Sequence, residues 1–111
     1  MEKRKLILKG IPASTGSVQG RAKIFMPGED NVAFSEGDIL VTSLTDPTMV
    51  QAMVKAAAIV TDTGGVTSHP AILSREMGIP CIVNTKEATK IIKNGDLILV
   101  DGTTGEIYEV D

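Results

Sequence analysis

The residues most suited to chemistry are one histidine and the small residues that precede it. His69 is the only histidine of the chain, and it ends the run GGVTSH at residues 64–69. A neutral imidazole is a nucleophile that can accept a phosphoryl group and release it again. Gly64 and Gly65 allow unusual backbone angles and leave space for a bulky anion, although the pair could also form a plain turn. Thr67 and Ser68 offer hydroxyls that could bind phosphate or cap a helix.

The elements around this run predict where His69 lies. Residues 57–61 are apolar and rich in β-branched side chains, which is typical of a buried strand. Residues 62–68 form a turn of small residues, and residues 70–77 favour a helix that ends at Gly78. Cys81–Val83 returns to a strand pattern. The sequence therefore predicts strand, glycine loop, helix and strand.

This order places His69 in the first turn of the helix. Thr67 or Ser68 is the expected N-cap, with a hydroxyl that accepts a hydrogen bond from a free backbone N–H. Pro70 is tolerated at the start of a helix and not deeper in it. A helix N-terminus carries unpaired N–H donors and a partial positive charge. It favours a neutral imidazole over an imidazolium and attracts an anion, as a histidine phosphoryl carrier requires.

Two charged residues could support the histidine. Asp62 either orients His69 or caps the loop, and the sequence leaves both roles open. Arg75 lies about two helical turns from His69, where it could reach a phosphoryl group or a partner, although its position favours a plain surface role. His69 itself could be a structural residue at a helix start.

Composition limits the classes of function. The chain has 111 residues, which is enough for a single domain over residues 1–111. Its net charge of −3 and aromatic content of 3% argue against nucleic-acid binding and against an anionic membrane partner. No signal peptide or membrane span is evident, and the lone Cys81 excludes an internal disulfide, so we expect a cytoplasmic protein in which Cys81 is a buried small hydrophobe.

The remaining pattern predicts an α/β fold of six or seven short strands and about three short helices in a mixed sheet. Central strand–helix–strand units favour parallel pairing, and hairpins at the ends favour antiparallel strands. Residues 10–20 read as a loop. Met49, Val50, Met53 and Val54 predict one apolar helix face after a start at Asp46-Pro47, with the methionines in the core. Further strands are expected at 6–8, 21–26, 39–42, 97–100 and 107–110, and a helix at 86–93 with Thr85 as its cap.

The run from residue 61 to residue 85 resembles the phosphohistidine signature of the PEP-utilising enzymes. The signature combines a glycine pair, a Thr-Ser/Cys-His triplet, A-I-x-x-R-E and G-I-P, and all of these stand at residues 64–80. Residues 10–20 resemble the family's opening G-x-x-A-S-P-G loop, and residues 101–105 its closing D-G-x-x-G. The family includes pyruvate phosphate dikinase, phosphoenolpyruvate synthase and Enzyme I of the sugar phosphotransferase system.

The resemblance implies a swivelling β/β/α phosphohistidine domain in which His69 carries a phosphoryl group between two distant sites. Those sites imply two partners, an ATP-grasp nucleotide-binding domain or subunit and a PEP/pyruvate-binding barrel, neither of which fits in 111 residues. The domain itself is expected to need no cofactor or metal, with Mg²⁺ accompanying ATP or PEP on the partners. It is not expected to turn over substrate alone.

The sequence departs from the family pattern at three positions. Val66 stands where many dikinases have Arg, Pro70 replaces the commoner Ala, and Thr15 replaces Pro in the opening loop. Without that arginine, charge stabilisation depends more on backbone N–H groups or on partners.

Two other functions compete with the carrier role. The chain could be a non-catalytic interaction or regulatory module that retains the fold, although the intact triplet of residues 67–69 argues against this. It could also be a small metal-dependent hydrolase built on Asp62 and His69. The single histidine and the lack of a second ligand cluster argue against that function.

Overall fold

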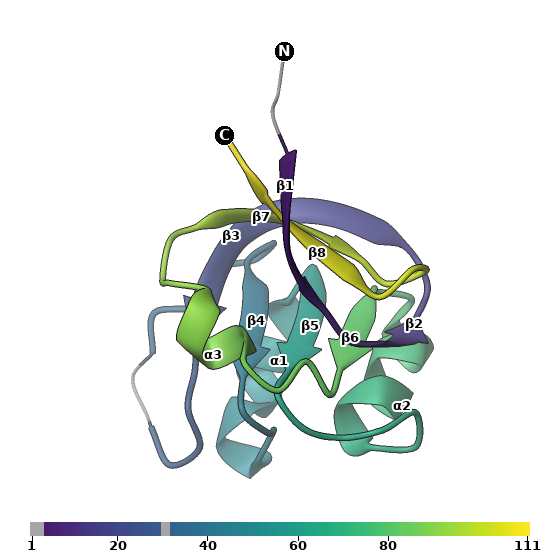
Figure 1. The fold of residues 1–111 in the computed structure, drawn as a ribbon. Helices are drawn as coiled ribbons and strands as arrows, with labels where there is room; N and C mark the ends of the chain where they lie inside the picture. The colour runs from purple at the N-terminus through teal and green to yellow at the C-terminus, as the bar shows by residue number, and fades with distance from the viewer. Residues whose placement is uncertain (1–3, 30–31) are drawn as a thin grey trace.

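The computed structural model describes residues 4–29 and 32–111, which form a mixed sheet of eight strands with three α-helices (Figure 1). The order of the strands across the sheet is β1-β8-β7-β3-β4-β5-β6-β2. The strands are β1 (Arg4–Lys9), β2 (Ile11–Ser14), β3 (Ser17–Ile24), β4 (Ile39–Thr42), β5 (Ala58–Thr61), β6 (Cys81–Val83), β7 (Leu97–Asp101) and β8 (Glu106–Val110). The helices are the 3-10 turn η1 (Pro47–Met49), α1 (Val50–Lys55), α2 (His69–Met77) and α3 (Ala88–Ile91).

The pairing has the predicted polarity. Strands β3, β4, β5 and β6 run parallel, and the outer pairs β1–β8, β7–β8, β3–β7 and β2–β6 are antiparallel. Parallel strands require crossover connections, which α1 and α2 provide between β4, β5 and β6. The prediction of a mixed α/β sheet is therefore confirmed.

Two apolar layers explain why β4 and β5 are buried on both faces. Ile39 and Val41 of β4 pack with residues of β7 and β8. Leu40, which lies between them, packs on the other face with Met49 of η1 and Met53 of α1. The half of the sheet formed by β1, β8 and β7 thus lies over the parallel half, whose other face is covered by α1 and α2 (Figure 1). Strands in the middle of such a three-layer β/β/α arrangement have continuous apolar sequences, because both of their faces are buried.

Several local predictions need correction. Residues 11–14 and 17–20 belong to strands and not to a loop, so the strand count exceeds the six or seven expected. Asp46 does cap the following turn, by accepting a hydrogen bond from the Thr48 N–H at 2.8 Å. Met49 and Met53 are fully buried as predicted, but Val50 and Val54 are 46% and 57% exposed, because the small Ala52 and Ala56 complete the buried face instead.

The last helix also differs from its prediction. It spans Ala88–Ile91 and not 86–93, and Thr85 does not cap it. The Thr85 hydroxyl donates instead to the carbonyl of Thr61 at 2.9 Å. None of the helices in the described ranges is long and apolar enough to cross a membrane.

Candidate functional site

The glycine loop, which we define as residues 62–68, leaves the carboxyl end of the buried central strand β5 and leads directly into α2. The helix begins at His69, one residue earlier than predicted, with Ser68 at the N-cap in an extended conformation (φ −70°, ψ 159°). Pro70 occupies the second helical position. The helix ends at Met77, and Gly78 adopts a left-handed conformation (φ 72°), the expected helix stop. His69 is therefore the first residue of a nine-residue helix, and it is exposed.

Ser68 does not cap the helix with its side chain. Its hydroxyl donates to the Gly65 carbonyl at 2.7 Å, and its backbone N–H donates to the same carbonyl at 3.0 Å. The expectation that a Thr67 or Ser68 hydroxyl accepts a bond from the first turn is wrong, because no side chain caps that end of α2. Pro70 has no N–H, so the first turn offers the N–H groups of His69 and Ala71, which have no acceptor within the helix and can bind an anion.

The two glycines of the loop have different requirements. Gly64 has a φ of +108°, which side-chain-bearing residues rarely adopt. A Cβ added to Gly64 would lie 3.1 Å from the Ser68 Oγ. Gly65 has open space around a hypothetical Cβ. The backbone conformation therefore requires glycine at position 64. At position 65 it does not, and no atom occupies the space that a side chain would take there.

A cavity of about 210 Å³ lies beside the histidine. Its walls come from the loop, from the first turn of α2 and from the segment that follows β4. The lining residues are Leu44, Thr45, Thr61, Thr63, Gly64, Ser68, His69 and Pro70. Apart from the imidazole, this lining contains no ionisable side chain and is rich in hydroxyls. Gly65 and Thr67 do not line it, and Thr67 is exposed.

Sequence reasoning missed Leu44, Thr45 and Thr63 as parts of this site. The sheet topology would have identified them. Thr42 pairs with Thr61, so the parallel strands β4 and β5 end at the same edge of the sheet. The segments after these strands therefore meet, and Thr63 donates from its N–H to the Ser43 carbonyl at 3.1 Å. Ligand sites in parallel sheets form at carboxyl edges of this kind.

Asp62 contacts α3, with no hydrogen bond to the histidine. Its two carboxylate oxygens accept from the Thr89 N–H at 3.0 Å and from the Thr89 hydroxyl at 2.5 Å. Its backbone carbonyl accepts from the Lys86 N–H at 2.9 Å. Neither of the two roles left open for Asp62 describes this contact, which joins the start of the glycine loop to Thr89 in the first turn of α3. In the described ranges no three His, Cys, Asp or Glu side chains gather as metal ligands, which leaves the hydrolase hypothesis without a ligand set there.

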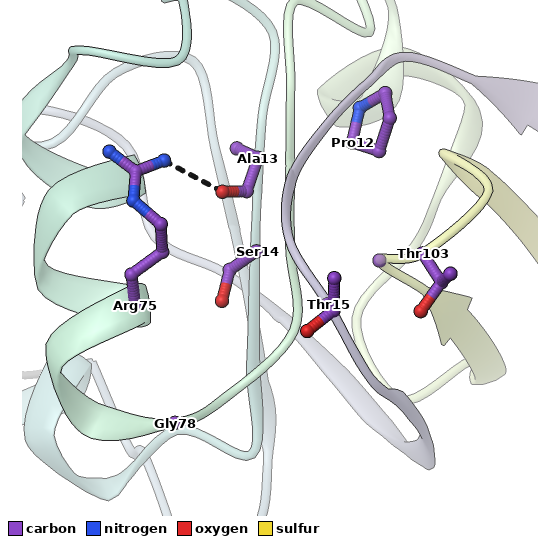
Figure 2. A pocket seen from close by; sticks show the side chains of 8 residues that line it. Pro12, Ala13, Ser14, Thr15, Arg75, Gly78 and Thr103 are labelled. Carbon is purple, nitrogen blue, oxygen red and sulfur yellow. Dashed lines mark hydrogen bonds between the residues drawn. The ribbon is translucent and has the colours of Figure 1, made fainter.

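Arg75 does not line the cavity beside His69. Its guanidinium donates from Nη1 to the Ala13 carbonyl at 2.8 Å and from Nη2 to the Val66 carbonyl at 2.6 Å. Figure 2 shows the first of these bonds at the rim of a second cavity of about 360 Å³. That cavity is lined by Pro12, Ala13, Ser14, Thr15, Arg75, Gly78, Gly102 and Thr103, none of which lines the cavity beside His69.

Cys81 is a buried hydrophobe, as predicted. It lies in β6, is fully buried, and packs in the layer between the sheet and the helices. Burial raises the pKa of the Cys81 thiol from 9.0 to about 11, and the neighbouring Ser74 hydroxyl and Arg75 charge offset only part of that effect. The thiol is therefore protonated at neutral pH and plays no part at the His69 site.

Comparison with known proteins links this geometry to one family. The profile described as "PEP-utilising enzyme, mobile domain" matches residues 34–105, which include the whole glycine loop and α2. Phosphoenolpyruvate synthase of Pyrococcus furiosus is 54% identical over 109 residues, which cover 98% of this chain and 13% of that protein. The chain thus spans about an eighth of the length of that relative.

Two solved structures share the fold. A solution structure of Enzyme I is similar with a TM-score of 0.57 and 33% identity, over 68% of this chain and 31% of that one. Aconitase X of Thermococcus kodakaraensis is similar with a TM-score of 0.69 over 98% of both chains. At 18% identity the second likeness concerns the fold alone.

Proposed function

The chain belongs to the PEP-utilising enzyme mobile-domain family, and on that premise we propose that it is a phosphoryl carrier. His69 is transiently phosphorylated and moves the phosphoryl group between an ATP site and a PEP/pyruvate site. Both sites lie on partner domains or subunits, an ATP-grasp nucleotide-binding unit and a PEP/pyruvate-binding barrel. The relatives named phosphoenolpyruvate synthase are about eight times longer, which leaves room for such units in them.

One observation carries the proposal: the only imidazole of the chain is exposed at the first position of α2, where no side chain uses the helix N–H donors. Because its side chain is exposed, His69 can reach phosphoryl donors that are bound to other domains or subunits. The backbone N–H groups of the first turn can then bind the oxygens of a phosphoryl group attached to the ring. The hydroxyls of Thr61, Thr63 and Ser68 donate to backbone carbonyls in this structure, so each would have to rotate before it could donate to a phosphoryl oxygen. We assign the support of that group to Gly64, Gly65, Thr67 and Ser68.

The chemical step is a displacement at phosphorus. One imidazole nitrogen forms an N–P bond while the bond between phosphorus and the donor oxygen breaks, and the electron pair leaves with that oxygen. Return of the group reverses the process, with an acceptor oxygen as the nucleophile. While the other ring nitrogen keeps its proton, the phosphorylated ring carries a positive charge, so the group that leaves when the phosphoryl group is passed on is a neutral imidazole.

Charge on the transferred group must be balanced from outside this chain. Among the described residues, those that line the cavity beside His69 include no lysine or arginine. Val66, at the position where many dikinases carry Arg, is 50% exposed and neutral. We therefore place the neutralising cations, including Mg²⁺ bound with ATP or PEP, on the partners.

The position of β1 and β8 suits a moving carrier. The start of β1 pairs with the end of β8, and both lie at the edge of the molecule away from α2 (Figure 1). A polypeptide that continued beyond either strand would leave from that one edge.

The test uses this chain with the P. furiosus enzyme from which the matching segment has been deleted. Intact mass is measured after incubation with ATP or with PEP, beside His69→Ala. We expect one acid-labile phosphoryl adduct on the wild-type chain and none on His69→Ala with its fold intact. Omission of each donor in turn identifies the donor, and addition of pyruvate should discharge an ATP-derived adduct. An adduct that survives His69→Ala, or no adduct with either donor, refutes the proposal and favours a non-catalytic interaction module.

A further inference from the structure

Arg75 joins three segments that are distant in sequence. It stands in the last turn of α2, and its guanidinium bridges the carbonyl of Ala13 in β2 and the carbonyl of Val66 in the glycine loop. Ala13 is buried, and its neighbours Pro12 and Ser14 pair with Ile82 and Cys81 of β6 on either side of an irregularity in the register. The arginine therefore connects the middle of the loop to an edge strand of the sheet, and Figure 2 shows its bond to Ala13.

The other hydrogen bonds of the loop lie at its two ends. Asp62 and Thr63 are held by Thr89, Lys86 and Ser43, and the Ser68 bonds to Gly65 remain within the loop. Within the described part of the chain, Arg75 supplies the hydrogen bond that reaches residues 64–67 from outside the loop. Loss of this bond would free the segment that immediately precedes His69.

The chemistry of arginine suits this role. The planar guanidinium presents several N–H donors in a rigid fork, so one side chain can donate to two carbonyls in fixed directions. A lysine has a single ammonium on a flexible stem and cannot hold two diverging acceptors with the same precision. Hydrogen bonds from a charged donor are also stronger than those between neutral groups.

We propose that Arg75 is a positioning residue for phosphoryl transfer, which holds the glycine loop so that its backbone and hydroxyls face the group on His69. The inference rests on the proposed carrier function. It assigns Arg75 an action through Val66 and not a contact with the phosphoryl group. Small displacements of a preorganised site can lower a rate by up to about 100-fold.

The test compares Arg75→Met and Arg75→Lys with Arg21→Met. Arg21 is a matched control, because its guanidinium donates to one carbonyl, that of Gly95 at 3.2 Å, far from the loop in sequence. Amide hydrogen exchange of Ser68, whose N–H donates to the Gly65 carbonyl, should accelerate roughly tenfold or more in Arg75→Met and remain unchanged in Arg21→Met. The maximal labelling rate of His69 with the deleted P. furiosus enzyme should fall about 10- to 100-fold, with the half-saturating carrier concentration unchanged. Arg75→Lys should be intermediate in both, and it replaces Arg75→Met if the latter does not fold.

The outcomes separate this inference from the proposed function. Wild-type labelling together with an unchanged rate in the Arg75 variant refutes the positioning role and leaves the carrier function intact. A rise in the half-saturating concentration without a fall in maximal rate also refutes it, because that result would make Arg75 a docking residue. If the wild-type chain is not labelled, the carrier function fails. The role of Arg75 is then decided by amide exchange of Ser68 and by phosphorylation of His69 with phosphoramidate, a chemical donor that needs no partner, and an unchanged result in both refutes it.

Discussion

Replacement of Gly64 by alanine should damage the site more than the fold. Gly64 has a φ of +108°, and a residue with a side chain held in such a sparsely populated region costs about 1–3 kcal/mol. The new Cβ would lie 3.1 Å from the Ser68 Oγ and 3.3 Å from its Cβ, so Ser68 must move by a few tenths of an ångström. Alanine also restricts the unfolded chain more than glycine does, which recovers about 0.4–1 kcal/mol of the free energy of unfolding. These two contributions leave a net loss of about 0–3 kcal/mol in the free energy of unfolding, to which the displacement of Ser68 adds.

The matched control is Gly95→Ala. Gly95 also has a positive φ, +89°, but a Cβ there meets nothing within 4 Å. It should incur a similar backbone cost without displacement of Ser68. Urea unfolding gives both stabilities, and intact mass gives both rates of His69 phosphorylation.

We expect Gly64→Ala to be phosphorylated at least about tenfold more slowly than Gly95→Ala at equal folded fraction, because Ser68 immediately precedes the histidine and lines its cavity. Equal rates for the two variants would contradict the reasoning, since they would show that the Gly64–Ser68 contact does not matter to His69. A smaller stability loss in Gly64→Ala than in Gly95→Ala would show that the loop relaxes its φ at no cost.

Two further predictions concern the supporting residues. Asp62→Ala should lower the free energy of unfolding by about 1–3 kcal/mol, because it leaves two Thr89 donors without their carboxylate. Thr89→Val should lose only the hydroxyl bond and cost less in the same urea titration, and an Asp62→Ala effect confined to labelling would instead indicate contact with His69. Cys81 should resist thiol reagents at pH 8 in the folded chain and react fully in denaturant, because its pKa is raised to about 11. The folded state then retains a proton that the unfolded state releases, so the stability difference between wild type and Cys81→Ala should shrink as pH rises above 9.0 towards 11. A difference that grows over this range would refute the assigned burial effect.

The buried strands were readable from sequence because both of their faces are covered. Ile39–Thr42 and Cys81–Val83 were predicted with their observed bounds, since uninterrupted apolar runs fit such strands. Strand β2 was missed because its sequence, IPAS, contains a proline and lies between two glycines, Gly10 and Gly16. Its place at the edge of the sheet, at the end of the strand order, explains how Pro12 is tolerated.

Helix α1 shows a second limit of pattern reading. Met49, Ala52, Met53 and Ala56 form the buried stripe at the proper helical spacing, and the valines at 50 and 54 face outward. The prediction counted large apolar residues and overlooked alanine. Which of two adjacent apolar positions faces the core depends on how closely the helix approaches the sheet, and a small residue permits that approach.

The position of His69 could be predicted, whereas the support of its loop could not, and the reason is the range of the interactions. A helix start is encoded within a few residues, so Ser68, His69 and Pro70 sufficed to place the imidazole in the first turn. Asp62 bonds to Thr89, and Arg75 bonds to Ala13, across separations of 27 and 62 residues that no spacing rule connects. Because Asp62 belongs to the loop and Arg75 also donates to the loop carbonyl of Val66, the geometry of the loop depends on the tertiary fold. A short peptide with the GGVTSH sequence should therefore lack the arrangement that we assign to phosphoryl transfer, even though it contains the nucleophile.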